Sequence, residues 1–166
     1  MSESVIECSV DIDAPREQVW AMVSDTRRYA EWIENTDRVV NASSERADAG
    51  VTYEERNTVV GPLKGNSTWV VDVAEAPRHA VHSGEGIAVA KDLRLEMTLE
   101  PEGEGTRYVH RLIYTPAFGP LAPLLNLVLK PSVTRATRRS LQTLRAICER
   151  EAQAAESRSD GVAAPA

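Results

Sequence analysis

Short runs with the character of β-strands fill the middle of this chain and limit what it can fold into. The predicted strands are 38–45, 51–60, 67–75, 79–85, 91–100 and 106–115. Turn residues such as Gly61-Pro62 and Ala76-Pro77 separate these runs, and none of the runs has helical spacing. Connections this short favour antiparallel pairing, because neighbouring parallel strands need a crossover of about a dozen residues. We therefore expect an antiparallel meander.

The N-terminal segment predicts one more strand and two short helices. Residues 5–12 alternate between apolar and polar side chains, which is the period of a half-buried strand. Pro15 suits the first turn of a helix, and an apolar helical stripe follows at 19–23. Ser24 or Asp25 can then cap a second short helix.

One long helix is predicted at the C-terminal end, from near Pro120 to about Ala154. Leu141 and Leu144 belong to its apolar stripe, and Pro131 should kink it. The following stretch, 155–166, has little apolar surface to bury. We expect one domain over residues 1–154 and a disordered tail after it.

These elements together predict an α+β fold of the helix-grip kind. A seven-stranded antiparallel sheet would wrap around the long C-terminal helix, because that amphipathic helix is the only cover available for the concave face. The two short helices after the first strand would support one end of the sheet. Such an arrangement commonly leaves a cavity between the sheet and the helix.

Composition limits the partners of this domain. The net charge of −6 argues against nucleic acid as the main partner, because phosphate binding needs a basic surface. No run approaches the roughly 20 apolar residues of a membrane span, and the first residues lack the basic and apolar regions of a signal peptide. We expect a cytoplasmic protein in which Cys8 and Cys148 are buried thiols.

A motif that begins at Ile12 carries a family resemblance. It has the form I-D-A-P-x-x-x-V-W-x-x-V-S-D-x-x-x-Y-x-x-W. It resembles the N-terminal signature of the START-related polyketide cyclase/dehydrase and lipid-transport superfamily (SRPBCC), which shares the birch-pollen-allergen-like fold. Further matches are Gly50-Val-Thr-Tyr, the 71–78 stretch and Gly105-Thr-Arg, so the resemblance covers residues 5 to about 150.

The resemblance implies a helix-grip fold and a hydrophobic ligand, but it does not name the ligand. Members include hydrophobic-ligand carriers, aromatase/cyclases, quinone-binding proteins and hormone receptors. The quinone-binding branch often has a proline after the tyrosine of the motif, where this chain has Ala30. This departure argues against a quinone chaperone.

The inward faces of the predicted strands indicate where a ligand would bind. In strand 51–60, Tyr53, Glu55 and Asn57 share the more apolar face. We expect Glu55 at the rim of the cavity, in water, because burying an unpaired carboxylate is costly. The predicted ligand-binding residues are Tyr53, Asn57, Trp69, Val71, Leu95, Met97, His110, Tyr114 and Leu141. The alternative is that these side chains fill the core and bind nothing.

Few residues predict catalysis. An imidazole in an apolar cavity could move a proton from a substrate, which makes His110 the best general base, with Tyr114 beside it on the same face. His79 and His82 would point to opposite faces of a strand, so we expect no metal site there and no cofactor. No motif for a positioned serine or cysteine nucleophile is present.

The stretch 118–131, FGPLAPLLNLVLKP, is more apolar than one gripped helix face requires. Leu121, Leu124, Leu125 and Val128 belong to it, and basic residues follow. One interpretation is a surface that transiently contacts a membrane or a protein. The other is a helix start buried by the short helices and nearby loops, or by a second copy.

Three hypotheses of function remain. The first is the binding of a small hydrophobic ligand, lipid-like or polyketide-like, between sheet and helix for sequestration or transport. The second is a polyketide cyclase or aromatase in which His110 and Tyr114 transfer protons. The third is an interaction protein that docks through the apolar start of the long helix. The oligomeric state is left open.

Overall fold

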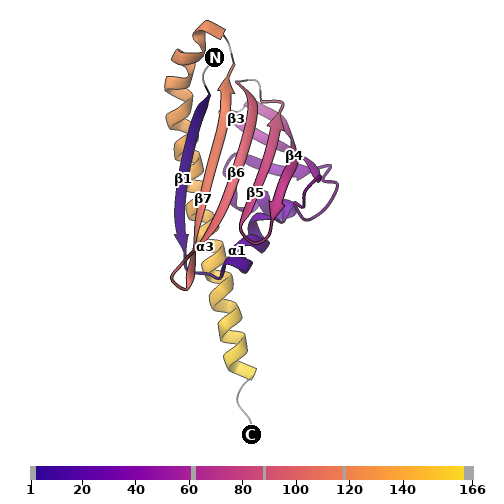
Figure 1. The fold of residues 1–166 in the computed structure, drawn as a ribbon, viewed down its shortest axis with the longest axis vertical. Coiled ribbons are helices and arrows are strands. Elements are labelled where there is room, and N and C mark those ends of the chain that lie inside the picture. The colour runs from indigo at the N-terminus through magenta and orange to yellow at the C-terminus, as the bar shows by residue number, and fades with distance from the viewer. Residues whose placement is uncertain (1–2, 61–62, 88, 118, 163–166) are drawn as a thin grey trace.

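A seven-stranded antiparallel sheet forms the main body of the protein (Figure 1). The computed structural model describes residues 3–162 apart from 61–62, 88 and 118. The strands are β1 (Ser4–Ile12), β2 (Thr36–Val40), β3 (Thr52–Val60), β4 (Leu63–Glu75), β5 (His79–Glu85), β6 (Ala90–Glu102) and β7 (Gly105–Pro116). Their order is β1-β7-β6-β5-β4-β3-β2, so every strand except β1 pairs with its neighbours in the chain. The expected meander is confirmed, and β1 extends it by pairing with β7.

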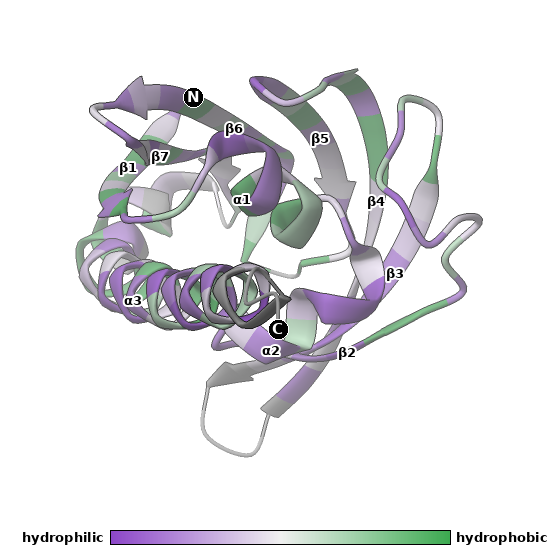
Figure 2. Ribbon diagram, turned by 90° about the horizontal axis from the view of Figure 1, so that it is seen from below, coloured by the Kyte–Doolittle hydropathy of each residue, from purple (hydrophilic) through white to green (hydrophobic). Residues whose placement is uncertain are grey.

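The helices complete the predicted helix-grip fold. They are α1 (Arg16–Val23), the 3-10 turn η1 (Thr26–Arg28), α2 (Tyr29–Trp32), the 3-10 turn η2 (Gly119–Leu121) and α3 (Ala122–Val162). Figure 2 looks along α3 and shows the curled sheet with its concave face turned towards this helix. Among the described residues, no helix has both the length and the apolar character needed to cross a membrane.

Several element boundaries differ from the expected ones; for example, strand β4 begins at Leu63 and not at 67. Strand β2 ends at Val40 instead of continuing to 45, because Asn41 adopts a left-handed backbone conformation with φ of 52°. Helix α3 continues through 155–162, where we expected a disordered tail, and extends past the sheet in Figure 1. This stretch, AESRSDGV, contains several residues of weak helix propensity, and nothing in its composition explains why the helix continues. The expected tail residues 163–166 lie outside the described residues.

Polar contacts fix the two short helices against α3. Asp25 accepts a hydrogen bond from the backbone N–H of Arg27 at 3.0 Å, so the expected cap at Ser24 or Asp25 is found at Asp25. The guanidinium of Arg28 lies 2.6 Å from the carboxylate of Glu151 on α3. The backbone N–H of Glu34 donates to the hydroxyl of Ser140, also on α3, at 2.9 Å. These contacts hold α2 at one end of the cavity described below.

The hydrophobic core extends across the inner face of the sheet, and one part of it lies where α3 meets β1 and α1. Leu141, Leu144 and Cys148 of α3 are buried there, together with Cys8 of β1 and Val19 of α1. Both cysteines are free and buried, as expected, and burial raises the pKa of the Cys148 thiol to about 12. None of these five side chains lines the cavity described below.

Candidate functional site

A cavity of about 390 Å³ lies between the sheet and the first half of α3. Strand β6 contributes Leu93, Leu95 and Met97 to its wall, and α3 contributes Leu129 and Val133. Such a volume is within the range of small-molecule sites, which are mostly apolar with a few polar groups.

Seven of the nine predicted ligand-binding residues line this cavity. They are Tyr53, Asn57, Trp69, Leu95, Met97, His110 and Tyr114. Val71 and Leu141 are not among the lining residues, and both are fully buried in the core instead. Val71 lies at the bulge where the pairing of β4 with β5 shifts, and Leu141 lies beyond the part of α3 that faces the cavity. Contact of the seven lining residues with a ligand stays a prediction.

Aromatic side chains gather at the end of the cavity next to α2. The hydroxyl of Tyr53 and Nδ1 of His82 are hydrogen bonded at 2.8 Å. Tyr29 packs edge-on against Tyr53, with ring centroids 5.4 Å apart, and Trp32 lies next to Tyr29. The Tyr29 hydroxyl, Trp32 Nε1 and His82 Nε2 are buried without a hydrogen-bond partner, although all three residues line the cavity. These atoms are free to bind polar atoms of a ligand.

His82 was not predicted as a cavity residue. Its position could have been predicted from strand β5, in which every second residue, Ala80, His82 and Gly84, lies on the inner face of the sheet. The HxxH spacing had been considered only as a possible metal site. His79 lies on the other face, and its ring is hydrogen bonded to Thr98 at 3.2 Å. The two histidines therefore point to opposite faces of the strand, as expected.

Gly84 makes room for one wall of the cavity. It pairs with Trp69 across β4 and β5, and a Cβ atom at position 84 would lie 2.6 Å from the ring of Trp69. Only glycine allows the indole to lie flat over the strand at this point. The ring of Trp69 then stacks on that of Tyr53, with an interplanar angle of 11° and centroids 6.4 Å apart.

Glu55 is buried in the cavity wall, which corrects the expectation of a carboxylate in water at the rim. The residue is only 7% exposed, and burial raises the pKa of its carboxyl group to about 7. The hydroxyl of Ser67, its neighbour across the strands, donates a long hydrogen bond of 3.5 Å to it. Ser67 itself accepts hydrogen bonds from Trp69 Nε1 and Asn57 Nδ2.

Two imidazoles face the cavity in their neutral form. Burial lowers the pKa of both His82 and His110 to about 4. Nδ1 of His110 lies 3.3 Å from the hydroxyl of Tyr108, with which it forms a hydrogen bond. At neutral pH the cavity therefore contains two uncharged imidazoles beside the one buried carboxyl group.

The hydroxyl of Tyr114 is occupied by a structural contact. It donates to Oδ1 of Asn126 at 2.5 Å, and Nδ2 of Asn126 donates to the hydroxyl of Ser4 at 2.7 Å. This chain of contacts connects β7, α3 and β1. Tyr114 lines the cavity, but its proton is directed away from His110, its expected catalytic partner.

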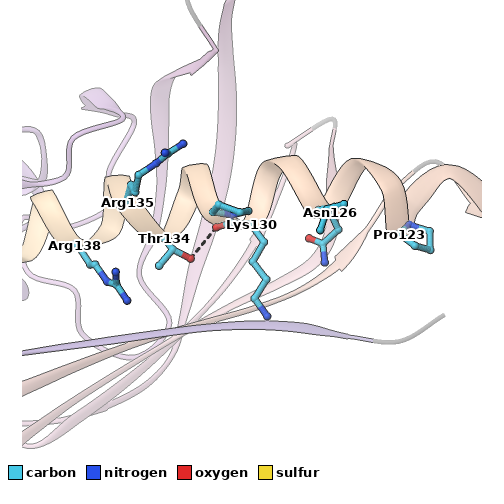
Figure 3. A pocket seen from close by; sticks show the side chains of 8 residues that line it. Pro123, Asn126, Lys130, Thr134, Arg135 and Arg138 are labelled. Atoms are coloured by element: carbon cyan, nitrogen blue, oxygen red, sulfur yellow. Dashed lines mark hydrogen bonds between the residues drawn. The ribbon is translucent and has the colours of Figure 1, made fainter.

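The start of α3 is an exposed apolar surface, which corrects the interpretation that it is buried by the short helices and loops. Leu121, Leu124, Leu127 and Val128 are 65% to 72% exposed. The side chain of Leu125, named with them above, lies outside the described residues. Figure 3 shows the open groove beside this surface, with Asn126, Lys130, Thr134 and Arg138 along one side of α3 and Arg135 on the other.

The comparisons with known proteins agree with this architecture. The Zhui aromatase/cyclase from Streptomyces sp. R1128 is 18% identical over 90% of this chain and 95% of that chain, with a TM-score of 0.77. TTHA0849 from Thermus thermophilus is 19% identical over 86% and 95%, with a TM-score of 0.73. Ara h 8.0201 is 9% identical over 86% and 98%, with a TM-score of 0.61. At these identities the likeness shows the fold alone.

The sequence itself places the chain in a family. No curated protein matches it significantly. A family model matches residues 4–149, which is most of the chain. The protein belongs to the family described as polyketide cyclase / dehydrase and lipid transport.

Proposed function

We propose that this protein binds a small hydrophobic ligand in the cavity between the sheet and α3, to sequester or transport it. The observation that carries the proposal is an apolar cavity of about 390 Å³ in whose wall buried polar atoms have no partner. Apolar burial would supply the affinity: about 300 Å² of ligand surface removed from water contributes roughly 7 kcal/mol before the cost of association.

The polar groups of the wall would orient the ligand. Trp32 Nε1 is a donor, and the Tyr29 hydroxyl can donate or accept. Asn57, on the same wall, bonds Ser67 and Thr36 and keeps further capacity for hydrogen bonds. A ligand that left such groups unpaired would lose affinity, so a purely hydrocarbon molecule fits this site less well than an oxygenated ring system.

Native mass spectrometry of the protein purified from its own host tests this proposal first. A stoichiometric lipid-like or polyketide-like molecule, released and identified after denaturation, is the expected result. Titration with the neutral dye Nile red gives a second measurement. Leu95→Trp, which fills the cavity, should abolish dye binding, whereas Ile113→Trp on the outer face of β7 should not. Empty protein that also fails to bind the dye would contradict the proposal.

An enzyme of the cyclase type is the second candidate. Its support is the pair of neutral imidazoles of His82 and His110 that face one enclosed cavity. In this hypothesis His110 and Tyr114 transfer protons while the cavity folds the substrate. Replacement of His110 by Gln separates the two functions: a carrier keeps its affinity for the ligand, whereas a cyclase loses turnover of a polyketide substrate.

A contact surface is the third candidate, and the exposed start of α3 supports it. Leu121, Leu124, Leu127 and Val128 present an apolar surface, and the cations Lys130, Arg135 and Arg138 follow it along the helix. Apolar side chains next to cations suit the interface of a membrane with anionic head groups. Docking on a protein is the competing outcome of the vesicle experiment described below. The cytoplasmic location expected from the sequence also stays a prediction.

A further inference from the structure

Glu55 is a charged residue of the cavity wall whose presence the binding of an uncharged hydrophobic ligand does not explain. The side chain lies on the inward face of β3, the residue is only 7% exposed, and it lines the cavity. The hydroxyl of Ser67 donates a long hydrogen bond of 3.5 Å to it, and hydrogen bonding from Trp69, Ser67, Asn57 and Thr36 lowers the pKa of its carboxyl group against the larger effect of burial. All four of these donors are neutral, so none of them balances the charge of an ionised carboxylate.

The described part of the chain supplies no cation for this carboxylate. No salt bridge to Glu55 forms among the described residues. Lys64 also lines the cavity, but its ammonium group lies 2.7 Å from Asp37 and also donates to Thr58. His82 and His110 are neutral at pH 7, because burial lowers the pKa of each to about 4. The charge of an ionised Glu55 would therefore be unbalanced inside an apolar site, which is costly.

Two aromatic residues, Tyr53 and Trp69, lie next to Glu55 in the wall of the cavity. Tyr53 is two residues before Glu55 on the same face of β3, and Trp69 is two residues after its cross-strand neighbour Ser67. The two rings stack with centroids 6.4 Å apart, and both line the cavity. A cation near an aromatic face gains about 0.5–2 kcal/mol, more when it is desolvated. Carboxylate and rings together form a site for an organic cation.

We propose that Glu55 makes this cavity selective for hydrophobic ligands that carry a protonated amine, whose ammonium group pairs with the carboxylate beside the rings of Tyr53 and Trp69. This inference rests on the proposed binding function and names the class of ligand for the same cavity. The ammonium group would supply the charged hydrogen-bond donor that the neutral donors around the carboxylate do not provide. Anionic ligands, such as fatty acids placed with their carboxylate next to Glu55, would be repelled in the low dielectric of the site.

Three probes of one shape test the proposal at pH 8, where Glu55 is ionised. They are 2-naphthylmethylamine, 2-naphthylmethanol and 2-naphthoate, titrated by calorimetry into the full chain. The expected result is that the amine binds at least about tenfold more tightly than the alcohol, and that the carboxylate binds most weakly. This comparison needs no variant, so it stands even if a substitution impairs folding.

Two matched variants then assign the preference to one residue. Glu55→Gln should bind the amine and the alcohol within about twofold of each other, because the ion pair is lost while the cavity keeps its size. Glu54→Gln removes the same charge from the opposite face of β3, where Glu54 bonds Asn41, and should keep the wild-type preference.

Three results would overturn the inference. If the wild-type protein bound the amine and the alcohol with equal affinity, the cavity would not be selective for amines. An unchanged amine preference in Glu55→Gln would show that another group carries it. If none of the three probes binds, the proposed hydrophobic-ligand function fails together with the inference, whereas binding of the alcohol without amine preference leaves that function intact.

Discussion

The two halves of α3 carry similar apolar residues and have opposite surroundings. In the second half, Leu144 is completely buried against the sheet and α1. At the start of the helix, Leu124 and Leu127 are 68% and 72% exposed. The residues around Leu144 pack against β1 and α1, so their side chains stabilise the fold. At the start of the helix Asn126 contacts β7 and β1, but the exposed leucines contribute little to stability and are free to serve another role.

The interior of the protein also differs between the region around Leu144 and the region around the cavity. Between Leu144 and the exposed start, α3 presents Val133 and Thr137 to the cavity, where the interior is unfilled. Polar groups such as Glu55 and His82 lie in that part and cost stability, because each is buried without a full set of partners. The well-packed part of the molecule stabilises the fold. The part around the cavity retains polar groups that lower stability, which we expect only if they bind a ligand.

The largest expected effect follows from truncating a leucine in the packed half. Leu144→Ala should lower the free energy of unfolding by about 2–5 kcal/mol, because the lost burial is added to the cost of a cavity. Leu127→Ala removes the same atoms from an exposed position and should change stability by less than about 0.5 kcal/mol. Urea denaturation of both variants measures the difference. Similar losses in the two variants would mean that the start of α3 is packed in solution, and the comparison would fail.

This contrast also shows what could be predicted from the sequence. Helical spacing identified Leu144 and Leu124 as apolar positions of one helix, but spacing does not say which part of the helix the sheet reaches. That depends on the length of the strands and on where α1 and α2 pack. The helix also continues to Val162, past the boundary at 154 expected from the sequence, and the disorder of the tail stays a prediction.

Those site residues whose position depends only on the alternation of side chains along a strand could be predicted from the sequence. Alternation correctly placed Tyr53, Glu55 and Asn57 on the inward face of β3. It could not show how deeply Glu55 is buried, because the neighbours that cover it, such as Ser67, come from another strand. That Trp32 Nε1 is buried without a partner could not be predicted either, because it depends on the positions of residues distant in sequence.

The second prediction concerns the stability cost of Glu55 in the cavity half. Burial raises the pKa of its carboxyl group from 4.5 to about 7, so its contribution to stability is fully present below pH 4.5 and is lost as the pH rises through 7. Glu55→Gln should therefore be more stable than the wild type by about 3 kcal/mol at pH 8, with little difference at pH 4.5. Chemical denaturation of both proteins at the two pH values measures this.

The difference in the free energy of unfolding between Glu55→Gln and the wild type reports on Glu55 and not on the histidines. Burial lowers the pKa of His82 and His110 from 6.5 to about 4, so both favour the folded state above pH 6.5 and lose this contribution as the pH falls towards 4. Their contribution is common to both proteins and cancels. A Glu55→Gln variant that is less stable than the wild type at pH 8 would show that the carboxylate is well paired, which contradicts an open acceptor in the cavity.

The third prediction concerns the wall of the cavity at Gly84. Gly84→Ala places a methyl group 2.6 Å from the ring of Trp69, so the ring has to move into the cavity. We expect a loss of about 1–3 kcal/mol in stability from the forced repacking, together with weaker binding of Nile red. Ser83→Ala, on the outer face of the same strand, is the control. Unchanged dye binding in Gly84→Ala would show that Trp69 does not shape the site.

The smallest effect on stability is expected at the exposed start of α3, where the effect on function should be large. Leu124→Glu combined with Val128→Glu adds charge to side chains that are 68% and 69% exposed, so the free energy of unfolding should change by less than about 0.5 kcal/mol. The fraction of the protein that sediments with phosphatidylglycerol vesicles should fall to the background fraction measured with phosphatidylcholine vesicles. Gln142→Glu adds one charge at another exposed position of α3 and should keep vesicle binding.

Stability and vesicle binding together decide what the exposed half of α3 does. If the double variant keeps wild-type stability and loses vesicle binding, the apolar start of the helix is a membrane contact that the fold does not need. If the wild-type protein does not bind anionic vesicles, the same surface binds a protein partner or a second copy of this chain. Sedimentation equilibrium would detect association with a second copy. If the double variant unfolds more easily, the residues are packed in solution, and the division of α3 into a structural half and a functional half is wrong.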